Sequence, residues 1–152
     1  MVRKMRFSLD RLMELGLLRK IPKSRLKAEE STNTAESWLI EAENNLKNGT
    51  FRSCILSSYL AMFHSARAIL FADGFREKSH FAVARYLEDR YIGRGLVEEK
   101  WINLLDHYRE IRHEDQYSTS FFVTEEEAKN SLQSAQEFVE RMKKLLSAVT
   151  KS

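Results

Sequence analysis

The sequence predicts an all-α fold: an up-and-down helical bundle of about five main helices with an extra short N-terminal helix. The 152 residues contain one proline and five glycines, and so few interruptions favour long helices over a many-turned β fold. Several segments repeat apolar residues at the i, i+3, i+4, i+7 spacing of an amphipathic helix. With 43% apolar and 31% charged residues, we expect one soluble globular domain with a sizeable core.

The N-terminal part is expected to be a short helix, a connector and a long helix. Residues 8–18 have an amphipathic pattern that stops before Pro22, the single proline. Residues 22–31 are rich in charge and are predicted to form the connector. The long helix is expected to begin near Asn33 or Thr34, because a capping box fits there, and to end before Gly49.

Four more helices are expected after Gly49. The first is the most apolar, which is typical of a central helix packed on several sides. The last opens with a capping box, Thr124 followed by Glu127. The expected helices cover residues 51–72, 79–92, 97–115 and the chain from Thr124 onward.

Charge divides the chain into two parts. Residues 1–30 carry nine Lys or Arg and four Asp or Glu, whereas the rest carries sixteen and eighteen. We therefore predict a basic N-terminal arm with a short helix over residues 1–31 and a helical bundle over residues 32–150. A basic arm attracts nucleic acid through its phosphates or packs on an acidic partner, and both remain open.

Several classes of protein are disfavoured by the sequence. The apolar runs are too short for a membrane span, and the N-terminus has no signal-peptide pattern. We therefore predict a cytoplasmic protein that does not associate with a membrane. The single cysteine, Cys54, lies in an apolar helical pattern and is expected to pack as a small hydrophobe. The four histidines are not spaced as ligands, so no metal and no cofactor are predicted.

The most informative segment is residues 106–117, in the predicted helix over 97–115. Arg112 lies four residues after Tyr108, within or beside the apolar stripe of this helix. Arg109 and His113 are four residues apart and share a neighbouring face. Two interpretations remain open. Arg112 pairs with a carboxylate at the edge of the core, or the arginines bind a phosphate beside a histidine that provides acid or base chemistry.

A second polar pair interrupts the apolar helix over residues 51–72. His64 and Arg67 are three residues apart, among small and apolar neighbours that predict close helix packing. We expect this pair to face the same cleft as Arg112 and to contribute to a phosphate or nucleotide site.

The same segments carry a family resemblance. Residues 59–70 (Tyr-Leu-Ala-Met-Phe-His-Ser-Ala-Arg-Ala-Ile-Leu), then Asp73-Gly74, Lys78-Ser79-His80 and a late arginine-rich helix with Tyr117, resemble the HEPN domain. HEPN stands for higher eukaryotes and prokaryotes nucleotide-binding. The likeness is to small stand-alone prokaryotic HEPN proteins and spans about residues 33–148.

The resemblance implies a homodimeric bundle, often paired with a minimal nucleotidyltransferase in toxin–antitoxin modules. In active members, an arginine, four to six intervening residues and a histidine form a metal-independent ribonuclease site. Here Arg112 matches that arginine best, but Tyr117 stands where the histidine is expected. The histidine role is therefore shifted to His113 or lost.

Two functional hypotheses follow. In the first, Arg112 and Arg109 bind the scissile phosphate of an RNA, and His113 is the general acid or base, in a homodimeric ribonuclease. In the second, the chain is a catalytically silent module that binds a nucleotide or a nucleotidyltransferase partner through the same basic face. Phosphate or nucleotide binding would involve Arg112, Arg109, Tyr117, His64 and Arg67.

Overall fold

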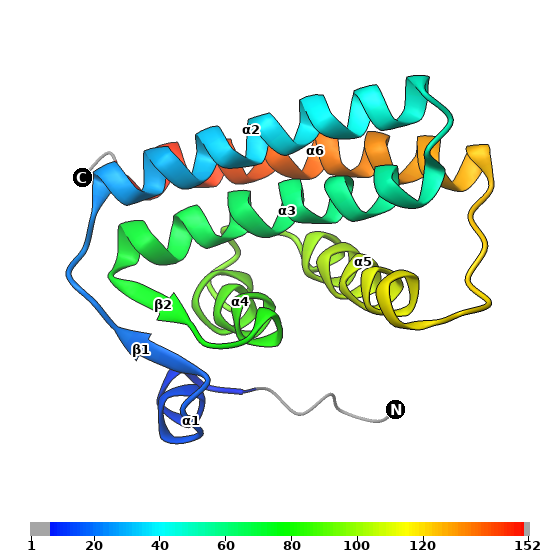
Figure 1. Ribbon diagram of the computed structural model, residues 1–152. Coiled ribbons are helices and arrows are strands. Elements are labelled where there is room, and N and C mark those ends of the chain that lie inside the picture. The colour runs from blue at the N-terminus through cyan, green and yellow to red at the C-terminus, as the bar shows by residue number, and fades with distance from the viewer. Residues whose placement is uncertain (1–6, 151–152) are drawn as a thin grey trace.

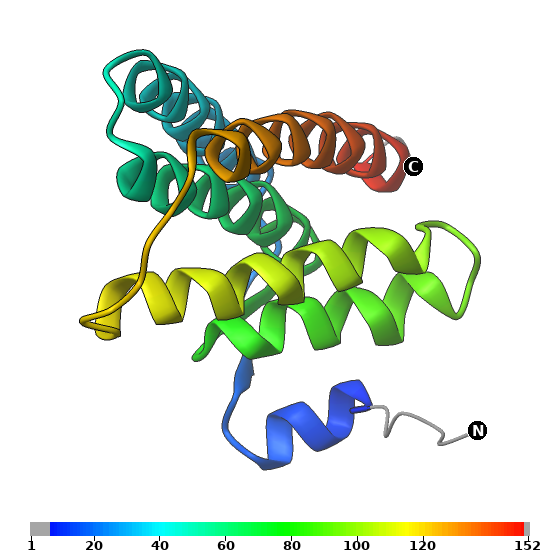
Figure 2. The same cartoon turned by 90° about the vertical axis from the view of Figure 1, so that its right-hand side faces the viewer.

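Three long helices lie alongside one another in the computed structural model, which describes residues 7–150 (Figure 1). They are α2 (Arg25–Lys47), α3 (Phe51–Asp73) and α6 (Glu125–Thr150). Two further helices, α4 (His80–Leu87) and α5 (Glu99–Tyr117), lie side by side and run across the long helices (Figure 2). The predicted all-α helical bundle is confirmed.

Helix α3 is the centre of the fold. It packs against α2, α6, α5 and α4, and its apolar side chains form much of the main core. Among the described residues, α3 alone is long and apolar enough by composition to cross a membrane, but 78% of its most apolar stretch is buried inside the bundle. Its central position therefore explains its apolar character.

Helix α2 begins earlier than the sequence indicated. The side chain of Ser24 accepts a hydrogen bond from the backbone N–H of Lys27 at 3.0 Å, which caps a helix that starts at Arg25. The predicted connector over residues 22–31 is therefore wrong from Arg25 onward. The charged side chains of this first turn face solvent, while Ala28 is 1% exposed, so the segment is one more amphipathic stretch of helix.

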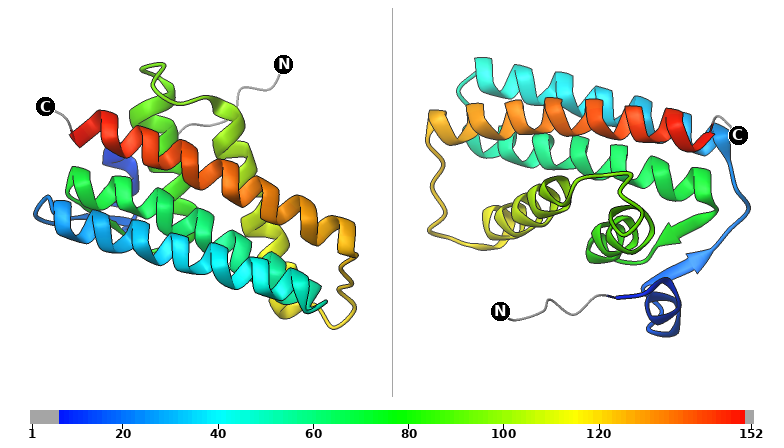
Figure 3. Two further views of the ribbon diagram at one scale, coloured as in Figure 1. Left: turned by 90° about the horizontal axis from the view of Figure 1, so that it is seen from above. Right: turned by 180° about the vertical axis from the view of Figure 1, so that it is seen from behind.

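The N-terminal arm is attached to the bundle by a helix and a strand. The predicted helix over residues 8–18 is shorter, α1 (Leu9–Glu14), and is followed by strand β1 (Leu18–Lys20). Strand β1 pairs antiparallel with β2 (Phe75–Glu77), which follows α3 (Figure 3). Leu12 is fully buried, so the arm contributes to the core. The sequence did not predict these two strands.

The ends of the other helices agree well with the turn residues. Gly74 ends α3 with φ +89°, in the left-handed region that glycine adopts without strain. A π-helical turn, η1 (Glu88–Ile92), extends α4 up to Gly93. The capping box of α6 is confirmed, because Thr124 Oγ1 accepts from the N–H of Glu127 at 3.1 Å and a Glu127 carboxylate oxygen accepts in return.

Candidate functional site: a cationic pocket between α4 and α5

The N-terminal end of α4 and the second half of α5 enclose a pocket of about 380 Å³. Its cationic and imidazole side chains are His80, Arg109, Arg112 and His113, and two glutamates complete the rim. Arg109, Arg112 and His113 were predicted from the sequence to share a site. The structure thus brings Arg109, Arg112 and His113 together and adds a histidine from another helix.

Arg112 has no acidic partner among residues 7–150. Its guanidinium lies over the ring of Tyr59 with 5.7 Å to the ring centroid, and its side chain is partly buried. No carboxylate of the described chain forms an ion pair with it. Contact with an aromatic face therefore supports this arginine, and its hydrogen-bond donors are left for an anion in the pocket.

Arg109 is held by the fold. Its Nη1 lies 3.2 Å from a carboxylate oxygen of Asp106, which also pairs with Arg85 of α4. Both guanidinium groups lie over the ring of Phe81, at 5.3 Å for Arg109 and 5.2 Å for Arg85. Arg109 therefore fastens α5 to α4 in addition to lining the pocket.

His80 is fixed by two aromatic residues of α3. Its ring stacks on Phe63 with centroids 3.9 Å apart and planes 10° apart, and its Nδ1 lies 2.9 Å from the hydroxyl of Tyr59. Burial, followed by the charge of Arg112, lowers the pKa of His80 from 6.5 to about 4. The imidazole is therefore neutral at pH 7.

The hydrogen bond to Tyr59 assigns the tautomer of His80. Burial raises the pKa of Tyr59, so its hydroxyl keeps its proton, and that hydroxyl has no other acceptor among the described residues. We therefore assign Tyr59 as the donor to Nδ1, which places the ring proton of His80 on Nε2. His80 is then a neutral hydrogen-bond donor.

His113 differs from His80 in its surroundings. It is exposed to solvent, and its ring lies against Tyr117, with centroids 4.7 Å apart. Tyr117 is 70% exposed at the end of α5. His113 is thus the accessible imidazole of the pocket, with room to exchange a proton with a bound molecule.

The structure places His64 and Arg67 outside this pocket. They line a different one, of about 260 Å³, together with Lys27 and Arg76. Arg67 forms an ion pair with the buried carboxylate of Glu77, and burial together with Arg67 lowers the pKa of His64. The expectation of a shared cleft with Arg112 is not met, and a phosphate-binding role for this pair remains a prediction.

His80 is the pocket residue that sequence reasoning did not include. The segment Lys78-Ser79-His80 was part of the family resemblance, and Ser79 caps α4 by accepting from the N–H of Ala82 at 3.3 Å. That cap signal predicts a helix start. The meeting of this helix with α5 depends on packing through Tyr59 and Phe63, which the spacing of residues in the chain does not show.

Residues 28–145 match the sequence model of the HEPN domain, so this small helical bundle with a cationic pocket belongs to the HEPN family. The chain is 30% identical over 115 residues to "Putative toxin MJ0605" of Methanocaldococcus jannaschii, covering 76% of this chain and 85% of that protein. It is also 30% identical over 96 residues to UPF0332 protein PH1297 of Pyrococcus horikoshii, covering 63% and 65%. The predicted family is thereby confirmed.

The end of α5 that carries Arg112 and His113 is attached to α3 by an ion pair whose carboxylate is buried. Asp115 has a fully buried side chain, and its Oδ1 accepts from Arg52 Nε at 2.6 Å. The backbone carbonyl of Asp115 accepts a second bond from the same guanidinium. This double contact fixes the last turn of α5 beside the pocket.

Replacing Arg52 by alanine is expected to lower the free energy of unfolding by about 2 kcal/mol. A fully buried carboxylate without its partner costs about 3–5 kcal/mol, and the loss is smaller here because the Arg52 side chain is 55% exposed to water. Urea denaturation measures the change. Arg11→Ala is the control, since its pair with Glu14 is exposed on both sides and is worth at most about 1 kcal/mol. An equal midpoint for Arg52→Ala and the wild type would contradict this role.

Proposed function

We propose that this protein is a toxin-type HEPN ribonuclease that acts as a homodimer and cleaves RNA without a metal ion. The observation that carries the proposal is the arginine without an acidic partner among the described residues, Arg112, which lines one pocket with two imidazoles. An arginine in this state suits a phosphate group, and a solvent-exposed imidazole such as that of His113 suits proton transfer. The name of the Methanocaldococcus relative supports the toxin role.

Each group in the pocket has a distinct part in the proposed reaction. Arg112 binds the non-bridging oxygens of the scissile phosphate, and Arg109 adds positive charge beside it. His80 donates a hydrogen bond from Nε2 to a phosphate oxygen, which stabilises the negative charge that develops there. Tyr59 holds His80 in the tautomer that this contact needs.

His113 carries the proton transfer. As a base, it takes the proton of the ribose 2′-hydroxyl, and the 2′-oxygen bonds to phosphorus while the bond from phosphorus to the 5′-oxygen breaks. The leaving 5′-oxygen takes a proton from the His113 imidazolium of the second copy. The products are a 2′,3′-cyclic phosphate and a 5′-hydroxyl end, so protons and electrons balance without a metal.

The homodimer gives the reaction a second imidazole for proton transfer, His113 of the other copy. One His113 lies on one side of the pocket, and acid–base cleavage needs a proton acceptor and a proton donor on opposite sides of the phosphate. The end of α5 and the loop after it also expose two aromatic side chains, Tyr117 at 70% and Phe122 at 79%. Exposed aromatic surface beside an open site suits contact with a second copy.

Wild-type protein is expected to cut single-stranded RNA in excess EDTA and to leave 2′,3′-cyclic phosphate ends. Gel analysis of labelled RNA, with and without phosphatase treatment that removes only non-cyclic phosphates, identifies the ends.

Light scattering at micromolar concentration is expected to give twice the monomer mass.

Intact RNA under these conditions, from a dimer that still binds a nucleotide or a minimal nucleotidyltransferase, would overturn the ribonuclease proposal. That outcome would favour the second hypothesis, a silent binding module. A monomer mass would count against the two-copy site.

A further inference from the structure

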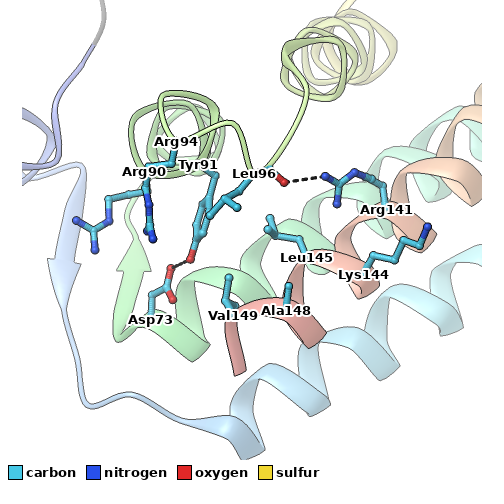
Figure 4. Close-up of a pocket in the computed structure, with 10 residues that line it drawn as sticks. All are labelled: Asp73, Arg90, Tyr91, Arg94, Leu96, Arg141, Lys144, Leu145, Ala148 and Val149. Atoms are coloured by element: carbon cyan, nitrogen blue, oxygen red, sulfur yellow. Dashed lines mark hydrogen bonds between the residues drawn. The ribbon is translucent and has the colours of Figure 1, made fainter. Parts of the chain in front are cut away.

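A second cavity, of about 480 Å³, lies between η1 and the C-terminal half of α6 (Figure 4). None of its lining residues belongs to the pocket of Arg112. The two sites are at opposite ends of the continuous helix formed by α4 and η1, which begins at His80 and ends at Ile92. That length corresponds to roughly 18 Å along the axis, so one small molecule does not fill both.

Four basic side chains form opposite sides of this cavity. Arg90 and Arg94 lie on the η1 side, and Arg141 and Lys144 extend from α6 (Figure 4). Arg141 is occupied by an ion pair with Glu98 at 3.0 Å. Within residues 7–150, no carboxylate forms an ion pair with Arg90, Arg94 or Lys144. The cavity therefore carries positive charge that the described chain does not neutralise, which suits an anion.

The carboxylate of Asp73, at the edge of the cavity, provides a hydrogen-bond acceptor. Oδ2 of Asp73 accepts hydrogen bonds from both Tyr86, at 2.6 Å, and Tyr91, at 2.5 Å. Oδ1 of Asp73 accepts none from the described residues. The tyrosines fix the direction of the carboxylate, so this second oxygen is available to a hydroxyl group of a ligand. The π-helical turn that carries Tyr91 is a rare element found often at functional sites.

Between the two charged sides, the cavity is apolar. Leu145, Ala148 and Val149 of α6 lie between the basic groups, with Leu96 above them (Figure 4). An inorganic anion would leave this surface uncovered. The site thus combines unpaired cations, a hydroxyl acceptor and an apolar surface within a volume that is usual for small-ligand pockets.

We propose that this cavity binds a nucleoside monophosphate: its phosphate on Arg90 and Arg94, a ribose hydroxyl on Asp73 and the flat base on the side chains of α6. A nucleoside monophosphate carries all three groups, whereas a simple sugar phosphate has no apolar body and an apolar acid has no hydroxyl. The site is separate from RNA cleavage and does not rest on the proposed function.

Isothermal titration calorimetry with the four nucleoside 5′-monophosphates, adenosine and inorganic phosphate tests the proposal. At least one monophosphate is expected to bind at least tenfold more tightly than adenosine or phosphate alone. Arg94→Glu is expected to weaken this binding at least tenfold, and Ala148→Trp is expected to do the same by filling the apolar side. Both side chains are exposed, so neither change disturbs the core.

Two variants serve as controls in this titration. Arg19→Glu makes the same charge change at an exposed position of β1, and Lys129→Glu makes a like change at an exposed position of α6, both outside the two pockets. Both are expected to keep wild-type affinity. Failure of all four monophosphates to bind at millimolar concentration would overturn the proposal. So would binding that Arg112→Ala abolishes and Arg94→Glu leaves intact, since that result would place the ligand in the pocket between α4 and α5.

Discussion

Replacing His113 by alanine is expected to lower the rate of RNA cleavage by roughly 10²–10⁴-fold, the usual effect of losing a general acid or base. RNA binding is expected to persist, because Arg112 and Arg109 make the phosphate contacts. The exposed position of His113 means that the change removes few packing contacts, so stability is expected to stay near that of the wild type. Single-turnover cleavage and filter binding on the same preparation measure the two quantities.

The matched control for this variant is His107→Ala. His107 lies on the same helix and is also exposed, but it does not line the pocket, and its ring lies against Tyr108. Cleavage by His107→Ala is expected to equal that of the wild type. Equal losses in the two variants would show that the effect comes from α5 in general, and full activity of His113→Ala would remove His113 from the mechanism.

The helices could be predicted from the sequence because their signals are local. The apolar spacing of α3, Gly74 after it and the capping box of Thr124 each depend on residues close together in the chain. The pairing of β1 with β2 could not be predicted in this way. It joins two three-residue segments that are far apart in the sequence, and their position depends on the packing of the arm.

The site was partly predictable for the same reason. Arg109, Arg112 and His113 lie on one helix, so their spacing placed them together. His80 comes from another helix, and its contact with this group requires the tertiary packing of α3, α4 and α5. Spacing along α3 also could not show that His64 and Arg67 line a different pocket from Arg112.

The partner of Arg112 was the central open question of the sequence. An arginine on an apolar stripe needed a carboxylate or an external anion, and the structure supplies the ring of Tyr59 instead of a carboxylate. Arg109, which is equally close to the pocket, does have a carboxylate partner in Asp106. In this account Arg112 contributes to phosphate binding, whereas Arg109 contributes to phosphate binding and to the stability of the fold. Variants at the two positions therefore distinguish a loss of binding from a loss of stability.

Arg112→Ala tests the account most directly when RNA binding and thermal unfolding are measured on the same sample. We expect RNA affinity to fall by about 10–100-fold, as for the loss of a charge-assisted contact, and stability to fall by no more than about 2 kcal/mol, the value of a partly desolvated cation–π contact. Arg109→Ala is expected to show a larger loss of stability, because it leaves Asp106 with one partner fewer. A loss of about 3 kcal/mol in Arg112→Ala with unchanged RNA affinity would contradict the account, since it would show that Arg112 serves the fold and not a phosphate.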